Sequence, residues 1–264
     1  MQNSWLKQNY NNPLFPDIVW NKPEQRSMSG KLLIIGGNQH DINTPSSAYN
    51  YALVAGVGEC RVIMPDATRK LFGKTPPENI EFVASTPSGS FSRQSYDDIL
   101  QYYHWADATL FAGGIGRNSE TAILLEELSR LKGPQTYTRD SADQFISNPA
   151  AIVNRPQTIL VATIAQLQAI GRALQLTTAV TFGMSVVTLA SHLETLTSEY
   201  PACFVVLHQK SIIVAMGEQV SITKLSDIPT TWRLITATYA TIWQMQQPAN
   251  PFKTITTAIT QIKY

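Results

Sequence analysis

The stretch KLLIIGGNQHDINTPSSAYNYALVAGVGECRVIMPD, residues 31–66, decides the fold class. It opens with an apolar run that ends at Gly36-Gly37, passes through a polar loop into a segment typical of a helix, and closes on a second apolar run. Continuous apolar runs are typical of strands that are covered on both faces of a sheet. A strand, a helix and a second strand in this order predict a parallel pair joined by a crossover helix.

The same alternation extends over most of the chain and predicts an α/β fold with a central, mostly parallel sheet. No Pro/Gly/Ser-rich linker and no repeat interrupts it, so residues 1–264 are predicted to form a single domain, in which 1–30, rich in Asn, Pro and aromatic residues, is an irregular lead-in. Further strands are predicted at 80–85, 108–114, 135–140, 158–163, 203–208 and 211–217, and helices at 45–56, 96–106, 119–131, 164–174, 178–200 and late in 226–243.

Composition and charge exclude several classes of protein. Of the 264 residues, 44% are hydrophobic and 15% are charged, and the formal net charge is +1. This near-neutral balance gives no electrostatic reason to expect a nucleic acid or a membrane surface as partner. Cys60 and Cys203 are too few for a disulfide framework, and no apolar leader or long apolar span is present. We therefore expect a soluble cytoplasmic protein.

Glycines at the ends of two predicted strands indicate where a ligand binds. In open α/β sheets, ligands bind beyond the carboxyl ends of the strands. Gly36-Gly37 ends one strand, and Gly113–Gly116 ends another and leads into a helix that starts near Asn118. Glycines let the backbone approach a ligand closely, and a helix N-terminus offers free N–H groups to an anion. A tight turn capped by Asn118 or Ser119 explains the same residues, and the sequence leaves both interpretations open.

Three stretches together resemble the ribokinase-like ADP/ATP-dependent NAD(P)H-hydrate dehydratases. Residues 31–66 resemble the family's opening, with Pro45 and Ala-Gly-x-Gly at 55–58 at matching spacing. ADATLFAGGIGRNSET, residues 106–121, resembles the family's Gly-Pro-Gly-Leu-Gly-Arg segment, and YTRDSADQF, residues 137–145, lies where the family has Asp-Ala-Asp. The resemblance runs from about Pro16 to the C-terminus and is specific as far as Asp140. It implies a ribokinase-like three-layer α/β/α fold.

The resemblance also implies a function and its ligands. The family repairs hydrated NADH and NADPH with ATP or ADP, so a nucleotide, accompanied by Mg, would be the cofactor, the hydrate would be the substrate, and homo-oligomers are expected. The protein itself has no histidine pair at metal-ligand spacing, so no metal site of its own is predicted. The positions that match substrate-binding motifs are Asn43, Thr44, Gly114 and Gly116, and those that match nucleotide-binding motifs are His208, Gln209, Lys210, Ser211 and Thr231.

The second half departs from the family where the chemistry should lie. Residues 163–166 read Thr-Ile-Ala-Gln instead of His-Pro-Gly-Glu, and 208–211 read His-Gln-Lys-Ser instead of Lys-Gly-Ala-His. Pro-Thr-Thr-Trp at 229–232 lies where Gly-Thr-Gly-Asp should open a late helix, and no glycine follows Gly217. Phosphoryl transfer needs a base and donors that stabilise the developing charge, and the loss of one donor costs about 10²–10³ in rate. We therefore expect catalysis to be weak or lost, as in a pseudoenzyme.

The residues leave several alternatives open. Asp227 or Asp140 could replace the missing base, which would make the protein an active dehydratase, a lyase, or a small-molecule kinase. Without such a base, it would be a non-catalytic nucleotide sensor or an assembly partner. Asp140 also fits a polar strand end, and residues 208–211 also fit a solvated hairpin turn. The identity of the ligand is therefore not fixed by the sequence.

Overall fold

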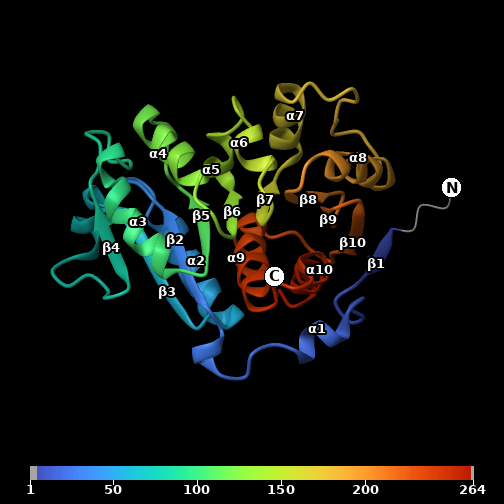
Figure 1. The fold of residues 1–264 in the computed structure, drawn as a ribbon, viewed down its shortest axis with the longest axis horizontal. Helices are drawn as coiled ribbons and strands as arrows, with labels where there is room; N and C mark the ends of the chain where they lie inside the picture. The colour runs from blue at the N-terminus through green and yellow to red at the C-terminus, as the bar shows by residue number, and fades with distance from the viewer. Residues whose placement is uncertain (1–4, 263–264) are drawn as a thin grey trace.

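The structure, a computed structural model, describes residues 5–262. In this part of the chain ten strands form one sheet in the order β1-β10-β9-β8-β7-β6-β5-β2-β3-β4 (Figure 1). The strands are β1 (Leu6–Gln8), β2 (Lys31–Gly36), β3 (Glu59–Pro65), β4 (Ile80–Val83), β5 (Ala108–Gly113), β6 (Gln135–Thr138), β7 (Thr158–Ala162), β8 (Cys203–His208), β9 (Ser211–Met216) and β10 (Gln219–Lys224).

The sheet is mostly parallel, as predicted. Among the described strands only β9 runs against the others, because β8, β9 and β10 form two successive antiparallel hairpins. All other neighbouring strands pair in parallel, including β1 with β10 at one edge. The carboxyl ends of β2, β5 and β6 therefore lie side by side and form part of the carboxyl edge of the sheet.

Helices cover both faces of the sheet. The longer helices are α2 (Asn43–Ala55), α3 (Tyr96–Trp105), α4 (Ser119–Ser129), α7 (Ile164–Ala173), α8 (Val186–Glu199), α9 (Trp232–Gln246) and α10 (Pro251–Thr260), and the short ones are α1 (Pro16–Trp20), α5 (Arg139–Asp143) and α6 (Ala150–Val153). Figure 1 shows α4, α6, α7 and α8 on one side of the sheet and α1, α9 and α10 on the other.

Strand β2 shows how the sequence builds these three layers. Leu33 and Ile35 are buried with α3, α4, α7 and α8, whereas Leu32 and Ile34 are buried with α1, α2, α9 and α10. Successive side chains of a strand point to opposite faces, so a continuous apolar run supplies both cores at once. The predicted α/β/α arrangement is confirmed.

Several boundaries differ from the sequence prediction. The helix predicted over 178–200 begins only at Val186, where the Ser185 side chain accepts a hydrogen bond from the Thr188 N–H and caps it. Strand β6 ends at Thr138, and its predicted last two residues open α5. Strand β10 was not predicted, and the described part of the lead-in contains β1 and α1 rather than irregular chain alone.

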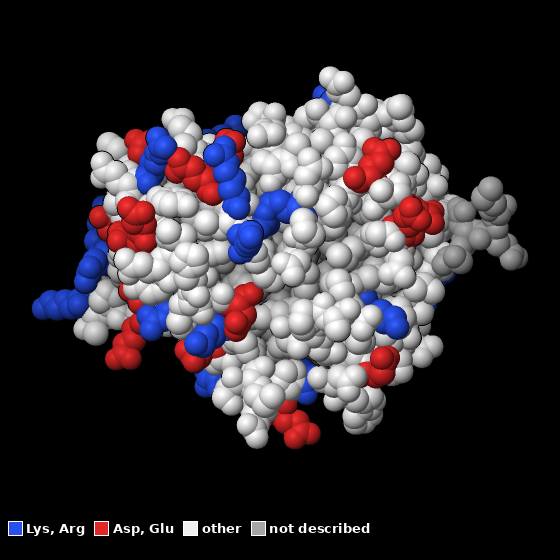
Figure 2. Space-filling view, in the orientation of Figure 1, with Lys and Arg blue, Asp and Glu red and all other residues white. Residues whose placement is uncertain are grey.

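The surface carries charges of both signs. Figure 2 shows acidic and basic side chains interspersed over the half of this face that is formed around α2, α3 and α4, and fewer charges over α7 and α8. In residues 5–262 no helix is long and apolar enough to cross a membrane.

Candidate functional site

Two glycine turns meet at the carboxyl ends of the neighbouring strands β2 and β5. The Gly37 N–H donates a hydrogen bond to the Gly113 carbonyl at 3.0 Å. A Cβ atom at Gly36 would lie 2.7 Å from that same carbonyl oxygen, and Gly37 and Gly113 have φ values of +90° and +89°. Only glycine fits this close approach and this backbone conformation without strain. The turns therefore fix the two loops against each other.

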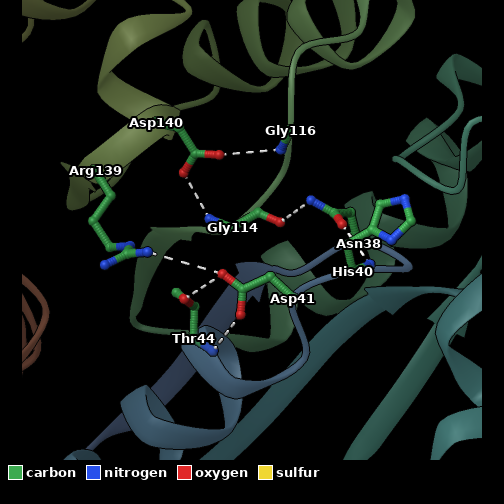
Figure 3. A network of polar contacts seen from close by, with 8 residues as sticks. All are labelled: Asn38, His40, Asp41, Thr44, Gly114, Gly116, Arg139 and Asp140. Carbon is green, nitrogen blue, oxygen red and sulfur yellow. Dashed lines mark hydrogen bonds and ion pairs between the residues drawn. The ribbon is translucent and has the colours of Figure 1, made fainter.

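Asp41 joins the first loop to the second. Its carboxylate accepts hydrogen bonds from the Thr44 N–H at 3.0 Å and from the Thr44 hydroxyl at 2.7 Å, at the start of α2 (Figure 3). A Cβ atom at Gly114 would lie 2.7 Å from Asp41 Oδ2. Asn38 closes the loop, because its amide donates to the Gly114 carbonyl at 2.6 Å. The polar loop thus holds the second glycine turn directly.

Asp140 occupies the hydrogen-bond donors of the second glycine turn. Its Oδ1 atom accepts from the Gly114 N–H at 2.6 Å, and its Oδ2 atom accepts from the Gly116 N–H at 3.0 Å (Figure 3). Gly114 and Gly116 have φ values of +71° and +73°, so both N–H groups are turned toward one acceptor. These two predicted substrate-binding residues therefore have backbone donors that are satisfied within the protein.

Arg139 comes directly after β6 and lies between Asp41 and the second turn. One of its terminal nitrogens lies 3.9 Å from Asp41 Oδ2, and its Nε atom is buried without a hydrogen-bond partner among the described residues. Its φ value is +58°. Non-glycine residues rarely adopt this conformation, and those that do are concentrated at functional sites.

The start of α7 supports the Arg139 backbone. Thr163 and Gln166 form a reciprocal capping box, in which each side chain satisfies a backbone N–H of the other. The Gln166 amide also donates to the Arg139 carbonyl at 2.7 Å and to Asp143 Oδ1 at 2.6 Å. The sequence that replaces the family's His-Pro-Gly-Glu thus acts as a helix cap that holds Arg139 and Asp143 in place.

Arg233 lies in the first turn of α9. Desolvation lowers the pKa of its half-buried guanidinium, and the positive charge of Arg139 lowers it further, against the opposing charges of Asp143 and Asp140. No acidic residue is present in the first turn of α9, and Thr231, the N-cap residue, makes no capping hydrogen bond with its side chain. This helix start therefore presents positive charge and no carboxylate.

The predicted nucleotide-binding turn forms the β8–β9 hairpin. His208 pairs with Ser211 across the turn, and Gln209 and Lys210 occupy it with φ values of +45° and +57°. His208 Nε2 lies 2.7 Å from the Met184 carbonyl, to which the Gln209 amide also donates at 3.1 Å. The side chains of His208 and Gln209 thus hold the segment before α8, and a nucleotide-binding role for the turn remains a prediction.

The other predicted residues are spread over the same edge of the sheet. Thr44 is buried, whereas Asn43 and Thr231 are exposed. Asp227 is exposed, and its Oδ1 atom accepts from the adjacent Ile228 N–H at 2.8 Å. Since β8 is the third strand from β5, the structure groups Thr44, the glycine turns and Asp140 but not the β8–β9 turn with them.

Sequence reasoning missed Asp41, Arg139 and Arg233 as site residues. Asp41 stands three residues before Thr44 at a helix start, which is the spacing of a capping residue. Arg233 lies in the first turn of a helix, where a positive charge is unfavourable because of the helix dipole. The spacing of Asp41 and the position of Arg233 were the two signals that the sequence offered. Arg139 gave none, since its conformation depends on contacts with Gln166 and the second glycine turn.

No metal centre is evident in the described structure. Between residues 5 and 262, no three His, Cys, Asp or Glu side chains are grouped so that they could hold a metal ion. The carboxylates at this edge are instead engaged with Thr44, Gln166 and backbone N–H groups.

The chain matches no family model. Over 117 residues it is 29% identical to the bifunctional NAD(P)H-hydrate repair enzyme Nnr of Methanothermobacter thermautotrophicus. This match covers 43% of the chain but only 22% of that enzyme, so the chain spans much less than the whole of that relative.

Solved structures resemble the chain over nearly its full length. A ribokinase-like superfamily protein from Enterococcus faecalis superposes with a TM-score of 0.71 and 12% identity, and covers 98% of this chain and 86% of that one. The chain has a ribokinase-like fold. The ADP/ATP-dependent NAD(P)H-hydrate dehydratase of Bacillus subtilis, co-crystallised with ATP/Mg²⁺, gives a TM-score of 0.60 at 9% identity, over 94% of this chain and 86% of that enzyme.

A kinase shares the same ribokinase-like fold. The pyridoxal kinase of Staphylococcus aureus, in complex with AMP-PCP, gives a TM-score of 0.55 at 10% identity, over 87% of this chain and 85% of the kinase. The predicted resemblance to the NAD(P)H-hydrate dehydratases is thus confirmed by a partial sequence match and by structural neighbours.

Proposed function

We propose that the protein is a divergent relative of the NAD(P)H-hydrate dehydratases that binds a nucleotide-like small molecule and catalyses the ATP- or ADP-dependent dehydration weakly or not at all. The ligand lies at the carboxyl edge of β2, β5 and β6, over the two glycine turns and the start of α9. The dehydratase and kinase neighbours, crystallised with ATP or an ATP analogue, support a nucleotide as the ligand. NADH or NADPH hydrate is the substrate class that the sequence relative supports.

The start of α9 carries the catalytic part of the proposal. Pro229 has no N–H to donate, the first helical turn contains no acidic residue, and Arg233 projects from it. A hydroxyl group that attacks a phosphate needs a positioned base and N–H donors that stabilise charge on the transferred group. The start of α9 supplies no such base, and Pro229 lacks one of the N–H donors.

The two acidic residues considered as replacement bases are poorly placed. Both oxygens of Asp140 accept backbone N–H groups, so a proton transfer to this carboxylate would break the turn that it holds. Asp227 is exposed and accepts from its own neighbour in the loop before α9. An active lyase or small-molecule kinase would therefore need one of these residues to move.

The test measures binding and turnover separately. Calorimetry with ATP, ADP, AMP, NADH and NADPH tests binding, and we expect at least one of them to bind at millimolar concentration. Conversion of hydrated NADPH to NADPH with ATP or ADP tests catalysis beside the Bacillus subtilis dehydratase, and we expect a rate lower by about 10² or more.

Two results would overturn the proposal in different ways. If none of the five ligands bound, the proposed nucleotide site would be contradicted. Turnover within tenfold of the Bacillus subtilis enzyme would show retained catalysis, and Asp227→Asn and Asp140→Asn variants would then locate the base.

A further inference from the structure

Residues 174–185, which link α7 to α8, are fastened to the rest of the protein at few points. Figure 1 shows them as a yellow loop at the rim of the molecule, without helix or strand. Within residues 5–262 the N–H groups of 177–183 donate no hydrogen bond to the protein. Most side chains of the loop are exposed, that of Phe182 to 64%. A segment with few hydrogen bonds and few buried groups opens at a low cost in free energy.

Two hollows flank this loop and leave it loosely packed. One, of about 380 Å³, lies between residues 174–178 and α8. The other, of about 290 Å³, lies between residues 176–181 and the end of α7. Leu176 and Thr178 line both hollows, so the chain at these residues lies between them. Side chains beside empty space lack the van der Waals contacts that hold a packed segment in place.

Two contacts fasten the middle and the far end of the loop. Val180 is buried, 8% exposed, and its carbonyl accepts from the Gln168 amide of α7 at 2.8 Å. Four residues further on, the Met184 carbonyl lies 2.7 Å from His208 Nε2 and accepts from the Gln209 amide at 3.1 Å. The first contact therefore holds the loop to a helix, and the second holds it to the β8–β9 turn of the sheet.

We propose that residues 176–184 form a strap that opens as one unit and whose closure is controlled by the β8–β9 turn. An internal hydrogen bond from the Met184 N–H to the Thr181 carbonyl, at 3.3 Å, joins the far end of the strap to its middle. A release at Met184 is therefore passed on to Val180, since the N–H groups between them hold nothing else.

Opening of the strap changes the surface between α7 and α8. The two hollows then join into one groove, which is rich in hydroxyl side chains. A turn at the end of β8 thus determines access to a groove in the helical layer. The strap does not depend on the proposed function, because its contacts are the same whether or not the protein binds a nucleotide.

Thiol labelling of a Val180→Cys protein measures how often the strap opens. The introduced thiol is buried while the strap is closed, so its reaction with iodoacetamide, followed by peptide mass spectrometry, reports the open form. We expect His208→Ala, made in this protein, to speed the labelling at least threefold, because it removes a hydrogen bond that holds the closed form. Lys210→Ala, in the same turn but without a contact to Met184, should leave the rate unchanged.

Two outcomes of the labelling experiment would overturn the strap. If His208→Ala speeds cleavage after Phe182 but not labelling at position 180, the residues near Met184 open alone. Cys203, fully buried in β8, reports global unfolding, and an equal rise in its labelling would assign the effect to loss of the whole fold.

Gln168→Ala gives the reciprocal test in a protein that keeps Val180. It removes the contact to the Val180 carbonyl, and we expect chymotryptic cleavage after Phe182 to become at least threefold faster. Arg172→Ala, an exposed position one turn further along α7, is the matched control and should leave cleavage unchanged. Unchanged cleavage in Gln168→Ala would show that the two contacts act independently, which contradicts a strap that opens as one unit.

Discussion

Asp140 Oδ1 accepts the Gly114 N–H at 2.6 Å, so the carboxylate on one loop completes the glycine turn on the next. In Asp140→Asn the amide has only one acceptor oxygen, and its NH₂ group faces an N–H donor. We expect a loss of about 1–3 kcal/mol in the free energy of unfolding, measured by urea denaturation. Asp227→Asn, in an exposed loop, should change it by less than about 0.5 kcal/mol. Equal losses in the two variants would show that the Asp140 contacts do not stabilise the turn.

Gly114→Ala tests the close approach of Asp41 to the second turn. Its Cβ atom would lie 2.7 Å from Asp41 Oδ2, and the position has φ +71°. Gly217→Ala is the matched control, because Gly217 also has a positive φ, +54°, but nothing lies within 4 Å of the added atom. The control should lose about 1–2 kcal/mol for its left-handed backbone, and Gly114→Ala should lose about 1–3 kcal/mol more, as thermal or urea unfolding would measure. Similar losses would contradict the tight contact.

The two thiols should lower the free energy of unfolding at alkaline pH. Burial raises the pKa of Cys60 to about 12 and raises that of the fully buried Cys203 as well. The stabilisation that each thiol contributes is complete below its unfolded-state pKa of about 8.5 and is lost as pH rises toward its folded-state pKa. In that range the unfolded chain releases protons that the folded chain retains. We expect the free energy of unfolding to fall by up to about 1.4 kcal/mol per pH unit for each thiol.

Urea unfolding at pH 8 and pH 10 measures this effect. The Cys60→Ser and Cys203→Ala double variant is the comparison, and its loss of stability between the two pH values should be smaller than that of the unmodified protein. The same slope in both proteins would assign the alkaline loss to other groups.

His208 should hold the segment before α8 in place through the Met184 carbonyl. His208→Ala removes the contact at 2.7 Å and leaves the weaker one from Gln209. We expect faster chymotryptic cleavage after Phe182, which is 64% exposed, since the chain around it opens more often. Lys210→Ala, in the same hairpin turn, should leave the cleavage rate unchanged, and limited proteolysis followed by mass spectrometry measures both.

The sequence predicted the fold where local signals were complete. In β2, α2 and β3, continuous apolar runs, glycines after β2 and Gly56 at the end of α2 define each element without distant partners. Strand β1 lacks such a signal, because its three residues become a strand only through pairing with β10. The segment before α8 is likewise held by a distant residue, His208, which contacts the Met184 carbonyl.

The candidate site was predicted only in part for the same reason. A glycine after a strand indicates a backbone conformation that other residues avoid, so the two turns could be predicted from the sequence. Arg139 adopts a positive φ because Gln166 holds its carbonyl, and no local pattern shows this. Arg233 lies on α9, far from Arg139 in the sequence, so no local pattern could link the two residues.

The pairing of β1 with β10 has a consequence for biosynthesis. Leu6–Gln8 leaves the ribosome well before its partner residues, Ser221–Thr223, are made. The Gln8 amide also donates to Thr223 and to the Thr256 carbonyl of α10, so these contacts form only after α10 has been made. Contacts between such distant segments form late, because closing a long loop costs entropy before the contact stabilises it. Strand β1 can therefore enter the sheet only after β10 has been translated.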